Sequence, residues 1–381
     1  MENIIDGIKK EVLDIFDHLH QNPEVSWKET ETTKFLARFL EEKNAKVRLF
    51  KNSTGVIGEI GEGSPVVAVR ADIDALWQEV DGTFQANHSC GHDAHMAIAA
   101  GVLSALLKVE DRPEGTVRFI FQPAEEKGTG ALKMVEEGVV DDVDYLYGIH
   151  LRPENELPEG LAAPAILHGA AKFMLGKIKG DDAHGARPHL GSNAIETGVS
   201  LVNMINGIHL NPMDSYSAKM TSFHAGGESA NIIPGSASFS IDLRAQKNET
   251  MELLEEKIHA ATENLASYYG TEITLETGAN IAAAESNEEA ITFMSKGITS
   301  VLGGDNLQPP IVTTGGDDFH FYTIKRPHLK ATMLGLGCGL TPGLHHPAMT
   351  FNKEALFDGI HILTATVIKT LEEGSVSLKN E

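Results

Sequence analysis

Hydrophobic residues fall into helix-like and strand-like spacings over the first part of the chain. Residues 4–20 place apolar side chains three and four positions apart, which predicts an amphipathic helix. Short apolar runs that predict strands lie at 47–50, 55–60, 66–72, 116–122 and 145–151, and further helices are expected after Ser26, over 92–108 and over 129–137. Glu29 follows Ser26 at the spacing of a capping box. The alternation of strands and helices predicts an α/β unit with a mostly parallel central sheet.

The order of the predicted elements changes between residues 168 and 285. Strands are expected at 171–180, 217–225, 237–245 and 271–276, and helices at 192–210 and 248–266. That β-α-β-β-α-β order is ferredoxin-like, and an α/β pattern resumes afterwards with helices at 288–302 and 352–372. We therefore predict one domain built from residues 1–167 and 286–381, with a ferredoxin-like α+β domain inserted at 168–285. Because the chain crosses twice between the domains, the connection is compatible with hinge closure.

The acidic composition of the chain argues against nucleic acid and anionic membranes as partners. The chain has 381 residues, with 31 Lys and Arg against 54 Asp and Glu, for a formal charge of -23. An acidic surface repels nucleic-acid phosphates and anionic lipid, so we expect neither as a partner. The N-terminus has no apolar signal core and no run of about 18 apolar residues occurs, so we expect a cytoplasmic protein with no membrane span.

Four segments carry residue types that bind metal ions. HSCGHDAHM at 88–96 offers a thiol, imidazoles and a carboxylate where a helix begins, and QPAEEKGTG at 122–130 follows a predicted strand. His150 ends another strand in GIHLRP, and the pair His345 and His346 precedes the last helix. Each segment alone is also explained by a solvated turn or a satisfied loop residue. Together they favour a two-metal site at the carboxyl edge of the sheet.

The adjacent carboxylates Glu125 and Glu126 allow a division of roles. Neighbouring side chains point in different directions, so one carboxylate can bind a metal ion while the other acts as a general base on water. Thiolate and imidazole ligands suit Zn, and Mn, Co or Ni would also fit such a site. An enzyme that uses Cys90 as a nucleophile is a competing interpretation.

These segments, with others along the chain, resemble a known family, the di-metal amidohydrolases of the aminoacylase and carboxypeptidase type. Within that family the chain is most similar to the branch of hippurate hydrolases and auxin-conjugate hydrolases. The motifs that carry the resemblance are LHQNPEVSWKE (19–29), VRADIDAL (69–76), HSCGHDAHMA (88–97), FQPAEE (121–126), GIHLRP (148–153), AHGARPHLGSNAI (183–195), ANIIPGSASFSIDLRA (230–245), GGDDFHFY (315–322) and LHHP (344–347).

The resemblance implies a role for each matching residue. It implies Cys90, His92, Glu126, His150 and His345 as ligands of two divalent metal ions, with Zn or Mn expected first, and Glu125 as the catalytic base. His346 stays an alternative to His345. In the inserted domain it implies substrate contacts by His184, His189, Asn231 and Arg244, with Asn231 and Arg244 holding the substrate carboxylate. Arg70, Asp72 and Asp74 are expected to support the site from behind, and Trp77 and Asp317 depart from the family's pattern.

The expected activity is hydrolysis of the amide bond of N-acyl amino acids by a metal-activated water. A dipeptidase or aminopeptidase of the same family is the nearest alternative, and a non-catalytic binding protein is an alternative of a different class. The expected partner is a small N-acyl amino acid or dipeptide. Oligomeric state stays open, although the exposed sheet edge of the inserted domain could pair with a second copy.

Overall fold

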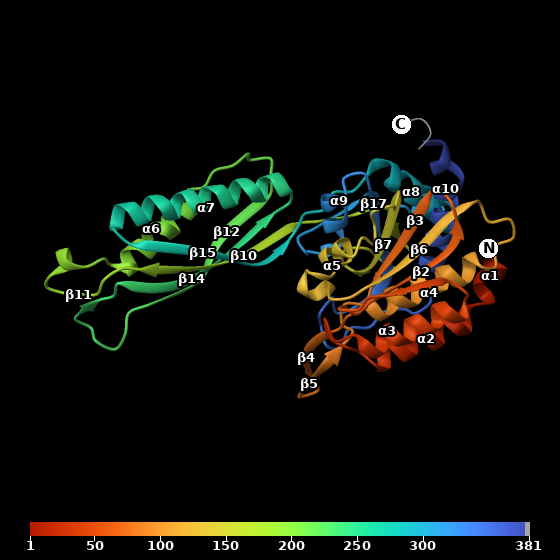
Figure 1. Cartoon of the computed structure of the whole chain (residues 1–381), viewed down its shortest axis with the longest axis horizontal. Coiled ribbons are helices and arrows are strands. Elements are labelled where there is room, and N and C mark those ends of the chain that lie inside the picture. The colour runs from red at the N-terminus through yellow and green to blue at the C-terminus, as the bar shows by residue number, and fades with distance from the viewer. Residues whose placement is uncertain (378–381) are drawn as a thin grey trace. The chain divides into compact units, whose positions relative to one another are not determined.

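Apolar segments buried on both faces form the central sheet of the larger of two units. The computed structural model describes residues 1–377. The strand order across this sheet is β1 (Lys46–Leu49), β2 (Val56–Glu62), β6 (Gly115–Gln122), β3 (Val66–Asp72), β7 (Tyr145–Pro153), β17 (Lys330–Leu340) and β8 (Ala162–Ala163). The neighbours β6, β3, β7 and β17 run parallel, while β1, β2 and β8 add antiparallel edges (Figure 1). The predicted α/β unit with a mostly parallel sheet is confirmed.

The helix that follows the cysteine motif lies at the centre of this unit. All of α4 (His92–Leu106) is buried, and it contacts β3, α2 (Lys9–Gln21) and α10 (Ala355–Ser377). Gly101 permits the close approach, because a Cβ at this position would lie 2.3 Å from a side-chain carbon of Ile360. Beyond its polar first turn, the helix is therefore buried and largely apolar on every side, as expected of a helix inside a core.

Helical segments cover both faces of the sheet. Consecutive residues of a strand point to opposite faces. Ile149 of β7 packs against α10, whereas a Cβ at Gly148 would meet Phe319 in the short helix η4 (Asp318–His320). The second face also carries α5 (Gly130–Glu136) and α9 (Phe321–Lys325), which contact each other and, in the case of α5, β6.

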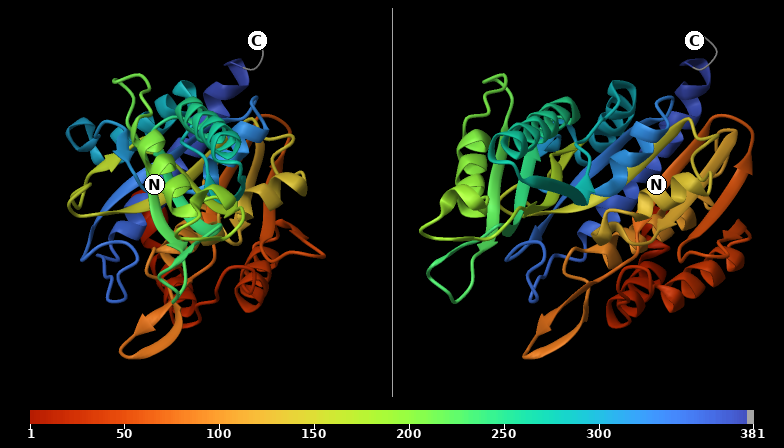
Figure 2. Two further views of the ribbon diagram at one scale, coloured as in Figure 1. Left: turned by 90° about the vertical axis from the view of Figure 1, so that its left-hand side faces the viewer. Right: turned by 60° about the vertical axis from the view of Figure 1, so that its left-hand side comes forward.

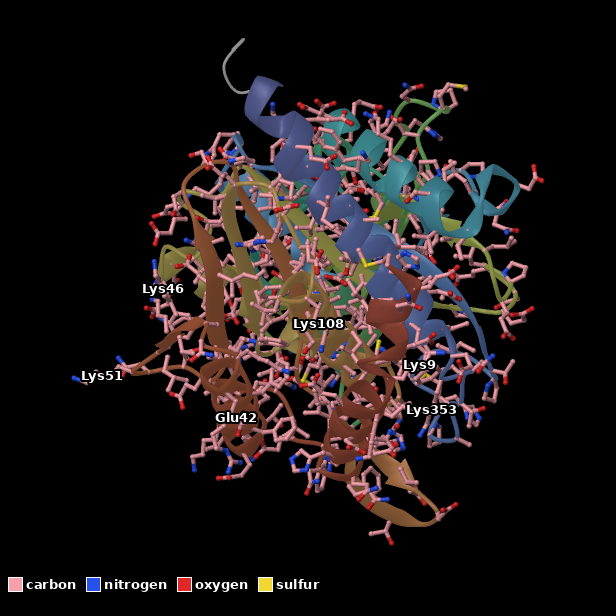
Figure 3. The ribbon with its side chains drawn as sticks, turned by 90° about the vertical axis from the view of Figure 1, so that its right-hand side faces the viewer. Lys9, Glu42, Lys46, Lys51, Lys108 and Lys353 are labelled. Carbon is pink, nitrogen blue, oxygen red and sulfur yellow. The ribbon has the colours of Figure 1, made fainter. Side chains whose placement is uncertain are left out.

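The N-terminal region differs from the predicted pattern in two places. The first helix is interrupted, giving α1 (Glu2–Asp6) and α2. The predicted capping box is wrong: Glu29 is itself the N-cap of α3 (Thr30–Glu42), and the Ser26 hydroxyl donates to Asp74 instead. Figure 3 shows the face that carries Lys9 and Lys353, where Lys353 pairs with Asp17 at 2.8 Å.

The remaining elements of this unit are short, apart from one helix. They are the hairpin β4 (Leu76–Val80) and β5 (Thr83–Asn87), η1 (Glu125–Lys127), β9 (Ile166–His168), α8 (Glu288–Leu302), η3 (Gly304–Asn306) and β16 (Ile311–Thr313). The β4–β5 hairpin is absent from the sequence prediction. Gln78 on this hairpin donates to the carbonyl of His345 at 3.0 Å, so the hairpin braces the His345 loop.

The second unit comprises His168–Ala284 with the short segment Thr313–Gly316. Its elements follow the chain order β10 (Ala170–Lys179), β11 (Ala183–His184), η2 (Pro188–Leu190), α6 (Ala194–Asn206), β12 (Tyr216–Ala225), β13 (Ile232–Ile233), β14 (Ser236–Ala245), α7 (Asn248–Tyr269) and β15 (Glu272–Ile281). The main sheet has the order β12-β14-β10-β15 and is antiparallel throughout. Leaving aside the two-stranded β11–β13 ribbon, this is the predicted ferredoxin-like order.

One face of this second sheet is covered and the other is open. In both views of Figure 2, α6 and α7 lie side by side over the four strands, and both helices contact the sheet. Met174, Ile178, Ile241 and Leu254 are buried between the layers, whereas Leu175 on the opposite face is exposed. Among the described residues of the whole chain, no helix is both long and apolar enough to cross a bilayer.

Candidate metal centre

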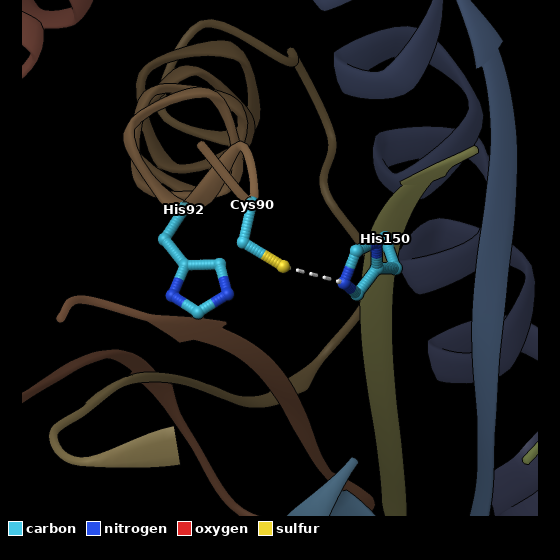
Figure 4. A group of neighbouring side chains, drawn as sticks. All are labelled: Cys90, His92 and His150. Carbon is cyan, nitrogen blue, oxygen red and sulfur yellow. Dashed lines mark hydrogen bonds between the residues drawn. The ribbon is translucent and has the colours of Figure 1, made fainter. Parts of the chain in front are cut away.

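The cysteine motif turns sharply where α4 begins. Gly91, between Cys90 and His92, has φ 85 and is the N-cap of the helix. A Cβ there would also approach Leu151 to 3.1 Å, so both the backbone conformation and the available space favour glycine. The turn brings the Cys90 Sγ to 3.6 Å from His150 Nε2 at the end of β7 (Figure 4).

Hydrogen bonds to backbone carbonyls fix the tautomers of two imidazoles. His92 Nδ1 lies 2.9 Å from the carbonyl oxygen of Asp74, and His150 Nδ1 lies 2.7 Å from that of Leu151. A carbonyl oxygen only accepts, so each Nδ1 carries the hydrogen and each Nε2 presents a lone pair. Both Nε2 atoms face the Cys90 side of the site, and His92 Nε2 is buried without a hydrogen-bond partner.

The two glutamates follow a residue in a left-handed conformation. Ala124 has φ 50 and ψ 41, and the next two backbone N–H groups, of Glu125 and Glu126, each donate to one carboxylate oxygen of Asp74 at 3.1 Å. Glu125 Oε2 and Glu126 Oε1 each lie 3.9 Å from His92 Nε2. Glu126 Oε1 is buried and has no hydrogen-bond donor, which leaves it available as a ligand.

The structure separates the two histidines of the LHHP segment. His345 has φ 64, its N–H donates to the Ser89 carbonyl at 2.7 Å, and its Nε2 lies 3.5 Å from Glu126 Oε1. His346 instead accepts the N–H of Ala348 on Nδ1 at 3.1 Å. His345 therefore joins the candidate ligands, and His346 completes a local turn.

The donor set fits divalent metal ions. Ligand atoms lie within 4.8 Å of one another in the groups Cys90, His92, His150; Cys90, Glu126, His345; and His92, Glu125, Glu126. Cys90, His92 and Glu126 each belong to two of these groups, so the three groups form one connected cluster of candidate ligands. Burial and the neighbouring Glu126 raise the pKa of the Cys90 thiol. A bound divalent cation reverses this effect, because a coordinating thiol is deprotonated outright.

His95, a further histidine of the cysteine motif, is excluded as a metal ligand because both of its ring nitrogens already form hydrogen bonds. His95 Nδ1 donates to Asp72 Oδ1 at 2.7 Å, and its Nε2 accepts the N–H of Leu151 at 3.1 Å. Asp72 also accepts from the fully buried guanidinium of Arg70 at 2.5 Å. His95 thus has no nitrogen left for a metal ion, and it fixes the strand beside His150.

A carboxylate far along the chain supports the glutamate segment, and the sequence reasoning missed it. Asp318 accepts from Arg70 at 2.9 Å, from Gln122 Nε2 at 2.8 Å and from the N–H of Ala131 at 2.8 Å. It therefore holds both ends of the loop that carries the two glutamates. Burial raises the pKa of Asp318 to about 7, with Arg70 opposing the shift. The adjacent acids in GGDDF were the signal available in the sequence.

The substrate-binding candidates of the second unit are all exposed, and none belongs to the ligand groups. His184 lies on β11 beside Asn231, whose carbonyl accepts the N–H of Gly185 at 2.7 Å, and His189 lies in η2. Arg244 lies near the end of β14 and pairs with Asp242 at 3.0 Å.

Asn231 and Arg244 come from different parts of the second unit, and their joint contact with one substrate carboxylate stays a prediction. Asn231 precedes the start of β14 at Ser236, whereas Arg244 is near the other end of that strand. From Ser236 to Arg244 the strand extends by roughly 26 Å, at about 3.3 Å per residue.

This fold and cluster define a metal-dependent hydrolase, and the comparisons with known proteins agree. The model of peptidase family M20/M25/M40 matches residues 68–369, so the chain belongs to that family of hydrolases acting on amide bonds. The resemblance seen in the sequence motifs is confirmed.

Named relatives and solved structures cover almost the whole chain. N-acetyl-L-cysteine deacetylase of Bacillus subtilis is 30% identical over 97% of this chain and 90% of its own length. The IAA-amino acid hydrolase ILR1-like 4 of Arabidopsis thaliana is 29% identical over 95% and 86%. A dinuclear metal-binding peptidase of the same family from Bacillus subtilis superposes with a TM-score of 0.80 at 27% identity, covering 96% of this chain and 99% of its own. A Staphylococcus aureus protein gives a TM-score of 0.88 at 26% identity, covering 97% and 98%.

Proposed function

We propose that this protein hydrolyses the amide bond of N-acyl amino acids. The observation that carries the proposal is the convergence of Cys90, His92, Glu126, His150 and His345 on one site beside Glu125. Those five residues would hold two divalent ions, Zn or Mn first, with Co or Ni as alternatives. When bound, such ions polarise the amide carbonyl and lower the pKa of water.

Glu125 is the proposed general base. Its carboxylate is largely buried, and its Oε2 lies 3.9 Å from His92 Nε2. Burial raises the pKa of Glu125, and the neighbouring carboxylates of Asp317 and Glu126 add to the shift, which favours uptake of a proton. Glu125 takes the proton of the attacking water and delivers it to the nitrogen of the leaving amine as the C–N bond breaks.

The substrate class follows from chemistry shared by the relatives. N-acetylcysteine and IAA-amino acids, the compounds in the relatives' names, are both N-acyl amino acids with a free carboxylate. We assign that carboxylate to Arg244, whose guanidinium can bind it with two parallel hydrogen bonds. His184, His189 and Asn231 remain candidates for other contacts with the substrate.

The test is a hydrolysis screen with the metal-stripped enzyme. Zn, Mn, Co and Ni are added back singly, and N-acetyl, N-benzoyl and indoleacetyl amino acids are compared with dipeptides. Metal-dependent release of the free amino acid from the N-acyl compounds supports the proposal. Preferential cleavage of dipeptides overturns the substrate assignment. Mass spectrometry of an acyl adduct on Cys90 would replace the metal-based mechanism with a nucleophilic one.

A further inference from the structure

A fully buried glutamate lies behind the catalytic turn and has no cation beside it. Glu29 has an exposed fraction of 0%, and among the described residues no Lys or Arg forms an ion pair with it. Its Oε1 accepts the N–H of Ala124 at 2.9 Å, and its Oε2 accepts the hydroxyl of Thr54 at 2.6 Å. Burial raises the pKa of Glu29. A buried carboxylate without a cation is costly, so its position calls for an explanation beyond packing.

The residue that Glu29 holds has an unfavourable backbone conformation. Ala124 is buried, and its φ of 50 places it in the left-handed region that residues with a Cβ avoid. It joins strand β6 to the turn that carries Glu125 and Glu126. Such strain persists only where the surroundings over-determine it, and it concentrates at functional sites.

Two carboxylates divide the backbone of this turn between them. Glu29 binds the N–H of Ala124, and Asp74 binds the N–H groups of Glu125 and Glu126. Three consecutive amides are thus fixed from outside the turn. The Ala124 carbonyl also accepts the N–H of Gly130 at 3.2 Å, so Glu29 restrains the N–H side of this residue. Loss of the bond to Glu29 would let Ala124 relax to an ordinary conformation and would redirect the glutamate side chains.

We propose that Glu29 is a positioning residue that holds Ala124 left-handed and thereby aims Glu125 at the substrate and Glu126 at the metal site. This inference rests on the proposed function for the roles of the two glutamates. The hydrogen bond itself does not depend on that function. In it, a buried carboxylate at the N-terminus of one helix fixes the backbone of a turn 95 residues further along the chain.

The test compares Glu29→Ala with rescue at the residue through which it acts. Glu29→Ala should lower kcat roughly 10- to 100-fold, since a displacement of about 1 Å costs up to that much. It should also lower metal content and speed hydrogen exchange of the amides at 124–126. Ala124→Gly should be tolerated alone, because glycine adopts the left-handed conformation freely. In the double variant it should restore most of the lost kcat, metal content and exchange protection.

Two further variants separate positioning from folding. Glu29→Gln keeps an oxygen for the Ala124 N–H and should retain kcat. Glu24→Ala is the matched control, because Glu24 accepts the N–H of Thr32 at the start of the same helix and does not touch the turn. It should lower the melting temperature without changing kcat or the exchange at 124–126.

Metal content and hydrogen exchange test Glu29 even if the wild type cleaves no N-acyl amino acid, so failure of the proposed function is a distinguishable outcome. Unchanged exchange at 124–126 in Glu29→Ala would overturn the positioning role. So would a double variant as impaired as Glu29→Ala, or a Glu24→Ala variant that loses kcat equally.

Discussion

The two units of the chain hold their candidate functional residues in contrasting ways. In the larger unit, Cys90, His92 and His150 are more than nine-tenths buried, and both imidazoles are oriented by a backbone carbonyl. In the second unit, Asn231 and Arg244 are exposed; Asn231 directly precedes β13, and Arg244 lies near the end of β14. The fold itself therefore orients the candidate metal ligands of the larger unit, whereas the second unit presents separate exposed side chains. Variants in the two units should differ accordingly.

The largest effect is expected for Glu125→Gln in the larger unit. The amide keeps the shape of the side chain but cannot take up a proton, and general acid–base catalysis contributes roughly 10²–10⁴-fold. We expect kcat to fall by that factor while metal content, measured by elemental analysis, stays at the wild-type level. Near wild-type kcat with metal bound would remove Glu125 from the role of base.

Loss of the shared sulfur is expected to come next. Cys90→Ala should reduce metal affinity by at least the roughly 10–100-fold that follows loss of a group merely supporting a ligand. Titration of the stripped protein with Zn measures the change. Cys338 provides the matched control, since it is also buried and unpaired but lies against the carbonyl of Arg152. Full metal occupancy in Cys90→Ala would refute the assignment of Cys90 as a ligand.

Variants of the two histidines in LHHP test which of them is a metal ligand. His345→Ala should lower metal content, whereas His346→Ala should leave it almost intact, because His346 only accepts a local N–H. The reverse result would transfer the ligand role to His346.

A smaller effect is expected in the second unit for Arg244→Ala. Loss of a charged hydrogen bond is worth about 1.5–3 kcal/mol, or roughly 10–150-fold in kcat/KM, with metal content unchanged. Esterifying the substrate carboxylate should then harm the wild type far more than the variant. Lys247→Ala removes another exposed cation that is paired with an Asp of the same unit. This control should leave kcat/KM unchanged for both the free and the esterified substrate. Equal losses on esterification for wild type and Arg244→Ala would show that Arg244 does not bind the carboxylate.

The smallest effect, on the free energy of unfolding, is expected for changes at equivalent helix N-caps in the two units. Asn193 accepts two N–H groups at the start of α6, and Asn287 accepts two at the start of α8. Each change to Ala should cost about 1 kcal/mol of unfolding free energy. If the units unfold separately, calorimetry should show each variant lowering a different transition. A single transition lowered equally by both would indicate that the units unfold together.

Local pattern in the sequence predicted the elements and most of the candidate site. Apolar runs predicted most strands of both sheets, and the CGHD and AEE segments predicted Cys90, His92 and the two glutamates as site residues. These features depend on residues a few positions apart, where spacing along the chain approximates distance in space. The errors arose where the local signal was ambiguous: Ser26 and Glu29 have the spacing of a capping box, yet their side chains bond to Asp74 and to Ala124.

The sequence by itself determined which residue types meet at the carboxyl ends of the strands, and hence a metal-dependent hydrolase of this family. Only the tertiary structure decided that His95 is fully bonded and that His345 rather than His346 faces Glu126. It also decided that Asp318 and Glu29 hold the catalytic turn. These contacts join residues up to 248 positions apart, and strand order and register bring them together. No local spacing encodes such partners, because the hydrogen bonds form only after the sheet has assembled.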